Sequence, residues 1–247
     1  MFLDLGRPCR PVLTPWVRTR RGSGVVPLCA MVISMTQLVV SALLFDLDGT
    51  LVDSTASVER NWHKLADGIE MPWEDVAPWI HGIPVRQVLA RLRPEMPVED
   101  VEYWHHFMVE AESSDTGDVM PIPGAVAAWD VLPTSRWAIV TSGGLRLATS
   151  RIRAAGLPMP RYLITADDVA VGKPNPAPYL MGAEKVGFPP SRCLAFEDAP
   201  AGIASARAAG VPVIGIATNH GDLGVATVRD LSEVEFSADR TGVVVTY

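Results

Sequence analysis

The chain has 247 residues, of which 48% are hydrophobic and 20% are charged, enough for one sizeable core or for a main domain with a smaller insertion. Its net charge of −7 and its pI near 5.2 argue against a concentrated basic surface, so we expect a small-molecule partner and neither nucleic acid nor a membrane. The three cysteines, Cys9, Cys29 and Cys193, are too scattered for a disulfide framework or a metal site, which favours a cytoplasmic protein. For the oligomeric state we expect a monomer or a weak dimer.

Residues 1–37 differ in composition from the rest of the chain. They hold one acid, Asp4, against five arginines, and an apolar run follows over 25–35, a layout that resembles a signal peptide. A membrane span is disfavoured because Pro27 and Gln37 interrupt the run, and a cleaved signal is disfavoured because no clear small-x-small site precedes Leu38. The interpretation we favour is a native start at Met31 or Met35 with a disordered or misassigned extension upstream.

The first regular element after this segment is a nearly continuous apolar run over 38–45, typical of a parallel strand buried on both faces. Similar runs recur at 137–140, 162–164, 193–196 and 211–216. Between them lie helix candidates at 124–132, 145–155, 177–186 and 199–209. Gly210 fits the C-cap of the last helix. This alternation predicts an α/β fold with a doubly wound, Rossmann-like parallel sheet.

Residues 54–120 interrupt the alternation. Helix-like stretches at 58–68, 85–92 and 98–112 occur there without a convincing strand, which predicts an all-helical inserted domain between two core segments, 38–53 and 121–247. The insertion also carries five aromatic residues at loose helical spacing: Trp62, Trp73, Trp79, Trp104 and Phe107. Such spacing is more typical of the core of a small domain than of a ligand cage.

Polar residues follow the predicted strands, and the carboxyl ends of parallel strands meet at one edge of a sheet. Asp46 and Asp48 end the first strand and point the same way in an extended exit, while Gly49 permits a sharp turn. Two carboxylates could divide nucleophilic and acid–base work. An Asx-turn or a helix cap explains one aspartate easily and two less well.

The second strand ends in a Thr-Ser-Gly-Gly segment, residues 141–144. Hydroxyl groups and exposed backbone N–H groups before a helix suit phosphate oxygens, although an ordinary helix cap accounts for the same residues.

Two further segments carry charge. Lys173 sits between glycine and proline residues in a stiff loop, where a fixed ammonium would offset negative charge, although most lysines are simply solvated. Glu197 and Asp198 follow a buried strand and offer hard oxygen ligands for Mg²⁺, with helix capping as the alternative for Asp198.

The four segments, in this order, resemble the motifs of the haloacid dehalogenase superfamily, whose helical cap is inserted after the first motif. The resemblance spans nearly the whole chain after Leu38. It implies that Asp46 is the nucleophile and a metal ligand, and that Asp48 is the general acid–base and binds the metal through its backbone carbonyl.

The same resemblance implies roles for the other motif residues. Thr141 would hydrogen-bond the phosphoryl group, together with backbone donors at Ser142 and Gly143. Lys173 would steady Asp46 and the phosphate. Asp198 would ligate Mg²⁺, with Glu197 reaching it directly or through water.

The expected function is therefore a magnesium-dependent phosphatase that hydrolyses small sugar or polyol phosphates through an aspartyl-phosphate on Asp46. Residues 54–120 would form the cap that selects the substrate. The segment from His81 to Gln87 is similar in placement to the specificity loop of sugar-phosphate phosphatases, so His81, Gly82, Arg86 and Gln87 are the candidate substrate contacts. A solvated helix face accounts equally well for Arg86 and Gln87.

Two other functions compete with hydrolysis. A β-phosphoglucomutase-like enzyme shares these motifs, but its hinge histidine corresponds to Val58 here and its cap-loop arginine lies one place earlier than Arg86. A phosphoacceptor or binding module without turnover is disfavoured because all four motifs are intact.

Overall fold

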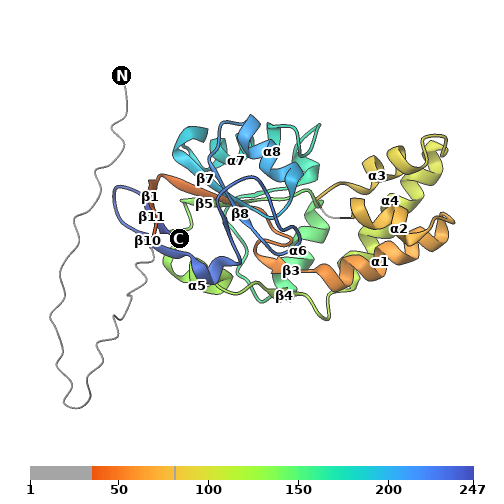
Figure 1. Cartoon of the computed structure of the whole chain (residues 1–247), viewed down its shortest axis with the longest axis horizontal. Helices are drawn as coiled ribbons and strands as arrows, with labels where there is room; N and C mark the ends of the chain where they lie inside the picture. The colour runs from red at the N-terminus through yellow and green to blue at the C-terminus, as the bar shows by residue number, and fades with distance from the viewer. Residues whose placement is uncertain (1–34, 81) are drawn as a thin grey trace, which may run out of the picture. The chain divides into compact units, whose positions relative to one another are not determined.

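The computed structural model describes residues 35–80 and 82–247. The predicted N-terminal extension over 1–37 lies almost entirely outside the described residues, as does His81 (Figure 1). No helix in the described part of the chain combines the length and the apolar character needed to cross a membrane.

The central element is a six-stranded parallel sheet with the strand order β6-β5-β2-β7-β8-β9. The strands span Ala42–Phe45 (β2), Trp137–Val140 (β5), Leu163–Ile164 (β6), Cys193–Glu197 (β7), Val213–Ile216 (β8) and Thr227–Val228 (β9). Strands β2, β5 and β7 are neighbours at the middle of the sheet. The predicted doubly wound α/β fold is confirmed.

Helices cover both faces of the sheet. They span Ala125–Val131 (α5), Leu145–Ala154 (α6), Ala177–Val186 (α7) and Pro200–Ala208 (α8). Leu43 and Phe45 of β2 enter one apolar cluster, which α5 and α6 complete. Ala42 and Leu44 enter a second cluster, which α7 and α8 complete. Successive side chains of β2 thus reach opposite faces, as expected for a strand buried on both sides.

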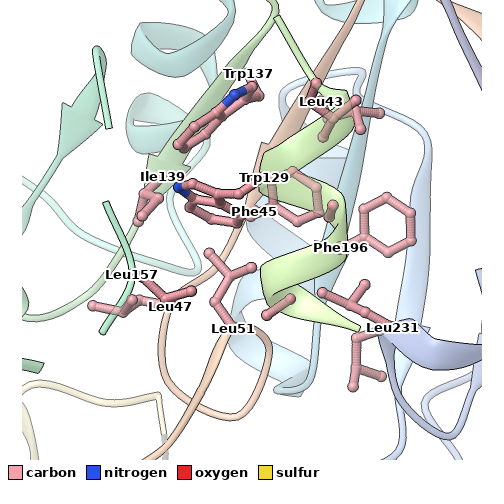
Figure 2. Close-up of a cluster of buried hydrophobic side chains, with 14 of the residues drawn as sticks. Leu43, Phe45, Leu47, Leu51, Trp129, Trp137, Ile139, Leu157, Phe196 and Leu231 are labelled. Atoms are coloured by element: carbon pink, nitrogen blue, oxygen red, sulfur yellow. The ribbon is translucent and has the colours of Figure 1, made fainter. Parts of the chain in front are cut away.

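Aromatic packing anchors the middle of the sheet (Figure 2). Phe45 stacks on Phe196 of the neighbouring strand with ring centroids 5.2 Å apart, and Trp129 of α5 lies 6.0 Å from Phe45. Trp129 also contacts Trp137, the first residue of β5, at 4.2 Å between centroids. This packing fixes the end of β2 that leads into Asp46.

The prediction of one strand over 38–45 is wrong. The run breaks at Ser41 into β1 (Gln37–Val40) and β2, which belong to different sheets. Strand β1 pairs antiparallel with β11 (Val243–Thr246), which also pairs with β10 (Glu235–Ala238). The Ser41 amide donates to the Arg192 carbonyl at 2.7 Å, and Arg136 donates to the Ser41 carbonyl at 3.0 Å, so the backbone at the break is satisfied by partners distant in sequence.

The segment that interrupts the α/β alternation is helical. Its helices span Thr55–Gly68 (α1), Trp73–Val76 (α2), Val85–Leu92 (α3) and Val98–Ser114 (α4), and a 3₁₀ turn spans Ala77–Trp79. All five aromatic residues named above belong to an apolar cluster separate from those of the sheet, as predicted. On either side of the helices, β3 (Val52–Asp53) pairs antiparallel with β4 (Met120–Pro121). The chain therefore leaves and re-enters the core through adjacent strands.

Candidate active site

The polar residues that follow β2, β5 and β7 converge beyond the carboxyl end of the sheet. Phe45 is in register with Ile139 on one side and Phe196 on the other, so the residues after these three strands are brought close together. Asp46, Thr141, Glu197 and Asp198 are all buried there, and Lys173 reaches the same place from the loop before α7. A cavity of about 300 Å³ opens over these residues and extends to the helical segment.

Lys173 is the central cation of the site. Its Nζ lies 2.5 Å from Asp46 Oδ1, contacts Glu197 Oε1, and donates to the Val140 carbonyl at 2.9 Å. Burial alone would lower the pKa of Lys173, but the Asp46 and Glu197 carboxylates raise it above its usual range, so the side chain stays charged. The Tyr179 hydroxyl donates to the same oxygen of Glu197, at 3.0 Å.

Asp46, Glu197 and Asp198 form a compact acidic cluster, with one carboxylate oxygen of each lying within 4.8 Å of the others. Burial and the Glu197 charge raise the pKa of Asp46 well above its usual range, and the same two causes raise the pKa of Asp198 to about 7. A single ammonium does not balance three carboxylates. Hard oxygen donors with an unbalanced negative charge suit Mg²⁺, so the residues present fit the ion that the sequence predicts.

The turn after β2 lets the residues of the acidic cluster pack closely. Gly49 has a φ of +80°, and a Cβ at this position would collide with the Asp198 carboxylate and with Asn219. Asn219 itself donates to Asp198 Oδ2 at 2.7 Å, and the Gly49 carbonyl accepts from Thr218 at 2.5 Å. Glycine is needed here both for the left-handed conformation and for the close approach of Asp198.

Asp48 lies apart from the acidic cluster. Its Oδ1 accepts from the Ser54 hydroxyl at 2.7 Å, and its Oδ2 lies 2.8 Å from Nη1 of Arg151 on α6. Arg151 in turn donates through Nη2 to Glu112 of α4 at 2.5 Å. Asp48 thus faces the cavity, and it is connected through Arg151 to Glu112 by a buried series of ion pairs.

The Thr-Ser-Gly-Gly segment forms another wall of the cavity. The Thr141 hydroxyl accepts from the Gly143 amide at 3.0 Å, and the Ser142 hydroxyl donates to the Gly82 carbonyl at 3.3 Å. The first helical amide of α6, at Leu145, is bonded to the Asp167 carboxylate at 2.8 Å. Ser142 therefore links the core to the loop before α3.

Residues 82–86 of the predicted specificity loop line the cavity, whereas Gln87 does not. Gly82 lines the cavity, with a φ of +74°. Arg86 also lines it, but its guanidinium makes a bidentate ion pair with Glu102 of α4, at 2.7 and 2.6 Å, and its side chain is half exposed. Gln87 is exposed on α3. His81 lies outside the described residues.

The polar residues of the site that were not predicted from the sequence include Glu112, Arg151, Tyr179 and Asn219. Two of them carried a detectable signal. On α6, Arg151 occupies a buried helical face with Leu147, Ala148 and Ile152, and on α4 Glu112 follows the buried Met108 by four residues. A charged residue on the apolar face of a helix is unusual enough to mark a site.

Comparison with known proteins identifies the class. Residues 40–210 match the family model of haloacid dehalogenase-like hydrolases, and the chain belongs to this family. It is 41% identical over 178 residues to hexitol phosphatase A of Escherichia coli, covering 70% of this chain and 81% of that protein. It is 37% identical over 194 residues to glycerol-1-phosphate phosphohydrolase 2 of Saccharomyces cerevisiae, covering 73% and 76% of the two chains.

A solved structure shares the fold. A hydrolase from Pseudomonas syringae superposes with a TM-score of 0.69 at 27% identity, covering 78% of this chain and 94% of that one. The expected family is therefore confirmed.

Proposed function

We propose that this protein is a magnesium-dependent phosphatase of small sugar or polyol phosphate monoesters that works through an aspartyl-phosphate on Asp46. The observation that carries the proposal is the placement of Asp46, buried against Lys173 and beside Glu197 and Asp198, at the base of the cavity. The names of the two curated relatives, a hexitol phosphatase and a glycerol-1-phosphate phosphohydrolase, support the substrate class.

In the first half-reaction an oxygen of Asp46 attacks phosphorus, a new O–P bond forms, and the bond from phosphorus to the ester oxygen breaks. Lys173 keeps the Asp46 carboxylate oriented and reduces its repulsion with the anionic phosphate. Thr141 and the backbone at Ser142 and Gly143 hold phosphate oxygens. Asp48 gives a proton to the departing alkoxide.

In the second half-reaction Asp48, now ionised, takes a proton from a water molecule that attacks phosphorus and releases Asp46 as a free carboxylate. The two roles of Asp48 follow from microscopic reversibility. Asp46, Asp198, the Asp48 carbonyl and Glu197, directly or through water, would hold Mg²⁺, which when bound supplies positive charge to the phosphate oxygens. The contact of Glu197 with Lys173 favours an indirect role for Glu197.

We also propose that residues 54–120 act as the cap over a core formed by 38–53 and 121–247. The link from Ser142 to Gly82 and the paired strands β3 and β4 support this division. Within the cap, residues 82–86 of the specificity loop line the cavity, and Gly82 and Arg86 are the candidates for substrate contact among them. Closure of such a cap excludes bulk water from the reaction.

Hydrolysis is favoured over the mutase alternative by the position of Val58. This residue, which corresponds to the hinge histidine of the mutase, lines the cavity and packs in the apolar cluster of the helical segment. It offers no group that could move a proton. Incubation with β-glucose 1-phosphate separates the two functions, because a mutase would yield glucose 6-phosphate without net phosphate release.

The proposal is tested by assaying the purified protein with Mg²⁺ against a panel of hexitol, glycerol and sugar phosphates. We expect release of inorganic phosphate that falls by roughly 10⁴-fold or more in Asp46→Asn, since this variant keeps the size of the side chain and removes the nucleophile. Release no greater than that of the Asp46→Asn variant on every ester would instead support a binding module.

A further inference from the structure

The Asp48 carboxylate is held at both of its oxygens. Ser54, just before α1, donates to Oδ1 at 2.7 Å, and Arg151 of α6 lies 2.8 Å from Oδ2. The Arg151 side chain is 4% exposed, whereas that of Asp48 is 28% exposed because it faces the cavity. The orientation of Asp48 toward the cavity therefore depends on a buried partner behind it.

Arg151 is held in turn by the helical segment. Its Nη2 donates to Glu112 Oε2 at 2.5 Å, and the Glu112 side chain is 8% exposed in the last turn of α4. Arg151 Nε has no hydrogen-bond partner among the described residues, so the two carboxylates determine the position of the guanidinium. A planar guanidinium can hold two carboxylates in a fixed geometry, which a lysine ammonium does not do.

The three side chains join two parts of the molecule. Asp48 follows β2 in the core and Arg151 lies on α6 of the core, whereas Glu112 lies on α4, which packs against α6. An ion pair that only held the two parts together would have no need to include a residue of the first motif. Here the series of ion pairs ends at the Asp48 carboxylate, which donates and accepts protons in the proposed reaction.

We propose that Arg151 is a positioning residue for Asp48, and that Glu112 sets the position of Arg151. The acid–base carboxylate is then correctly placed only when α4 lies against α6, which links the placement of the cap to proton transfer. This inference rests on the proposed function, in which Asp48 is the general acid–base. Arg151 itself touches neither the substrate nor the reacting atoms.

The test separates the two half-reactions by choice of leaving group. Nitrophenolate leaves without a proton, so phosphorylation of Asp46 by p-nitrophenyl phosphate needs no acid, whereas attack of water on the aspartyl-phosphate still needs Asp48 as a base. In Arg151→Met we expect a burst of about one nitrophenol per active site at close to the wild-type rate, followed by slow turnover. Steady-state kcat for glycerol phosphate should fall about 10- to 100-fold with little change in KM.

The results that would contradict this inference differ from those that would contradict the proposed function. If the burst itself slows as much as turnover on glycerol phosphate, or if both rates are unchanged, Arg151 does not act through Asp48 and the inference is wrong. A wild-type protein that releases phosphate from neither ester refutes the proposed function instead. Arg153→Met is the matched control, since Arg153 is exposed on the same helix, and it should behave as wild type.

Removing a buried cation could prevent folding, so Arg151→Lys provides a second route. It keeps the charge but can satisfy only one carboxylate well, and we expect the same burst with a smaller loss of turnover. Thermal denaturation of each variant checks that the protein is folded. An Arg151→Lys enzyme with wild-type turnover on both esters contradicts the need for two-carboxylate geometry and so overturns the inference.

Glu112 is tested by a double-mutant cycle. Glu112→Gln should lower turnover on glycerol phosphate several-fold, and adding it to Arg151→Met should cause no further loss, because the effect of Glu112 passes through Arg151. Losses that multiply in the double variant would show that Glu112 acts independently and would overturn the second half of the proposal.

Discussion

Glu112 is a carboxylic acid with 6% relative exposure in the last turn of α4. Burial raises its pKa from the ordinary value of 4.5 to about 7, the Arg151 charge opposes that rise, and the Asp48 charge adds to it. The folded protein therefore binds a proton that the unfolded chain has already released between these two pH values. Stability is lost as the pH rises through this window, and the loss is complete above pH 7.

Replacing Glu112 by Gln removes this titration. We expect the free energy of unfolding of Glu112→Gln, measured relative to that of wild type, to increase by on the order of 2–3 kcal/mol between pH 5 and pH 8, because wild type loses stability over this range and the variant does not. Urea denaturation at both pH values, in metal-free buffer, measures the difference. Glu110→Gln is the control, because Glu110 is exposed on the same helix. A pH-independent difference between Glu112→Gln and wild type would contradict the assigned titration.

At the level of single residues, the sequence predicts some members of the site but not others. Four residues of the site could be predicted from their positions in the sequence. Three of them directly follow buried strands, whose carboxyl ends lie together at one edge of a parallel sheet: Asp46, Thr141 and Asp198. The fourth, Lys173, lies between glycine and proline residues in a stiff loop. Arg151 could not be assigned to Asp48, since 103 positions separate them and the pairing depends on how α6 packs. Likewise, the pairing of Arg86 with Glu102 is a tertiary contact between two helices.

Among the elements, α8 shows how closely a helix approaches the site. Its first turn contains Gly202, and a Cβ at this position would collide with the Glu197 carboxylate. That carboxylate also contacts Lys173 and Tyr179. The helix can therefore lie against the end of β7 only with glycine at this position.

We expect Gly202→Ala to destabilise the fold by about 1–3 kcal/mol, even though alanine is the better helix former, because the added methyl overpacks a buried site. Turnover should fall as well, since Glu197 is pushed from Lys173. Chemical denaturation and phosphatase assays measure the two effects. At Gly221 an added Cβ meets no atom within 4 Å, so Gly221→Ala serves as the control. Full stability and activity in Gly202→Ala would contradict the close packing described above.

The elements themselves were predictable to different degrees. The helix at 177–186 and the strand at 137–140 match the structure at both ends, because each has a clear apolar pattern bounded by polar or turn residues. The break at Ser41 was not predictable, since both halves of the run are apolar and only the pairing of β1 with β11 separates them. Short strands such as β9 depend on a neighbouring strand and have little local signal.

For the whole molecule, the distribution of charge favours a bound cation. The chain carries a net charge of −7, and three of its acids are buried at one point with a single lysine. Like charges held together in a low-dielectric interior oppose folding unless a counter-charge is present. A divalent cation should therefore stabilise the protein in addition to supporting its activity.

We expect EDTA to abolish phosphate release and Mg²⁺ to restore it. At a concentration of 100 times its dissociation constant, Mg²⁺ should add about 2.7 kcal/mol to the free energy of unfolding, seen as a rise in Tm. Asp198→Asn should lose most of this rise, whereas Asp222→Asn, on the exposed loop after β8, should keep it. Full turnover by metal-stripped protein would contradict the metal site.

The pairing of β3 with β4 has an evolutionary consequence. Because the helical segment begins and ends at neighbouring strands, a segment of different length or sequence can be inserted there while the sheet keeps its strand order. Under the proposed function, in which this segment selects the substrate, new substrate preferences would arise by exchange of the single segment between Asp53 and Met120. The residues at the strand ends would be inherited unchanged, whereas a hybrid enzyme would also need an acid at the position of Glu112 to hold Arg151.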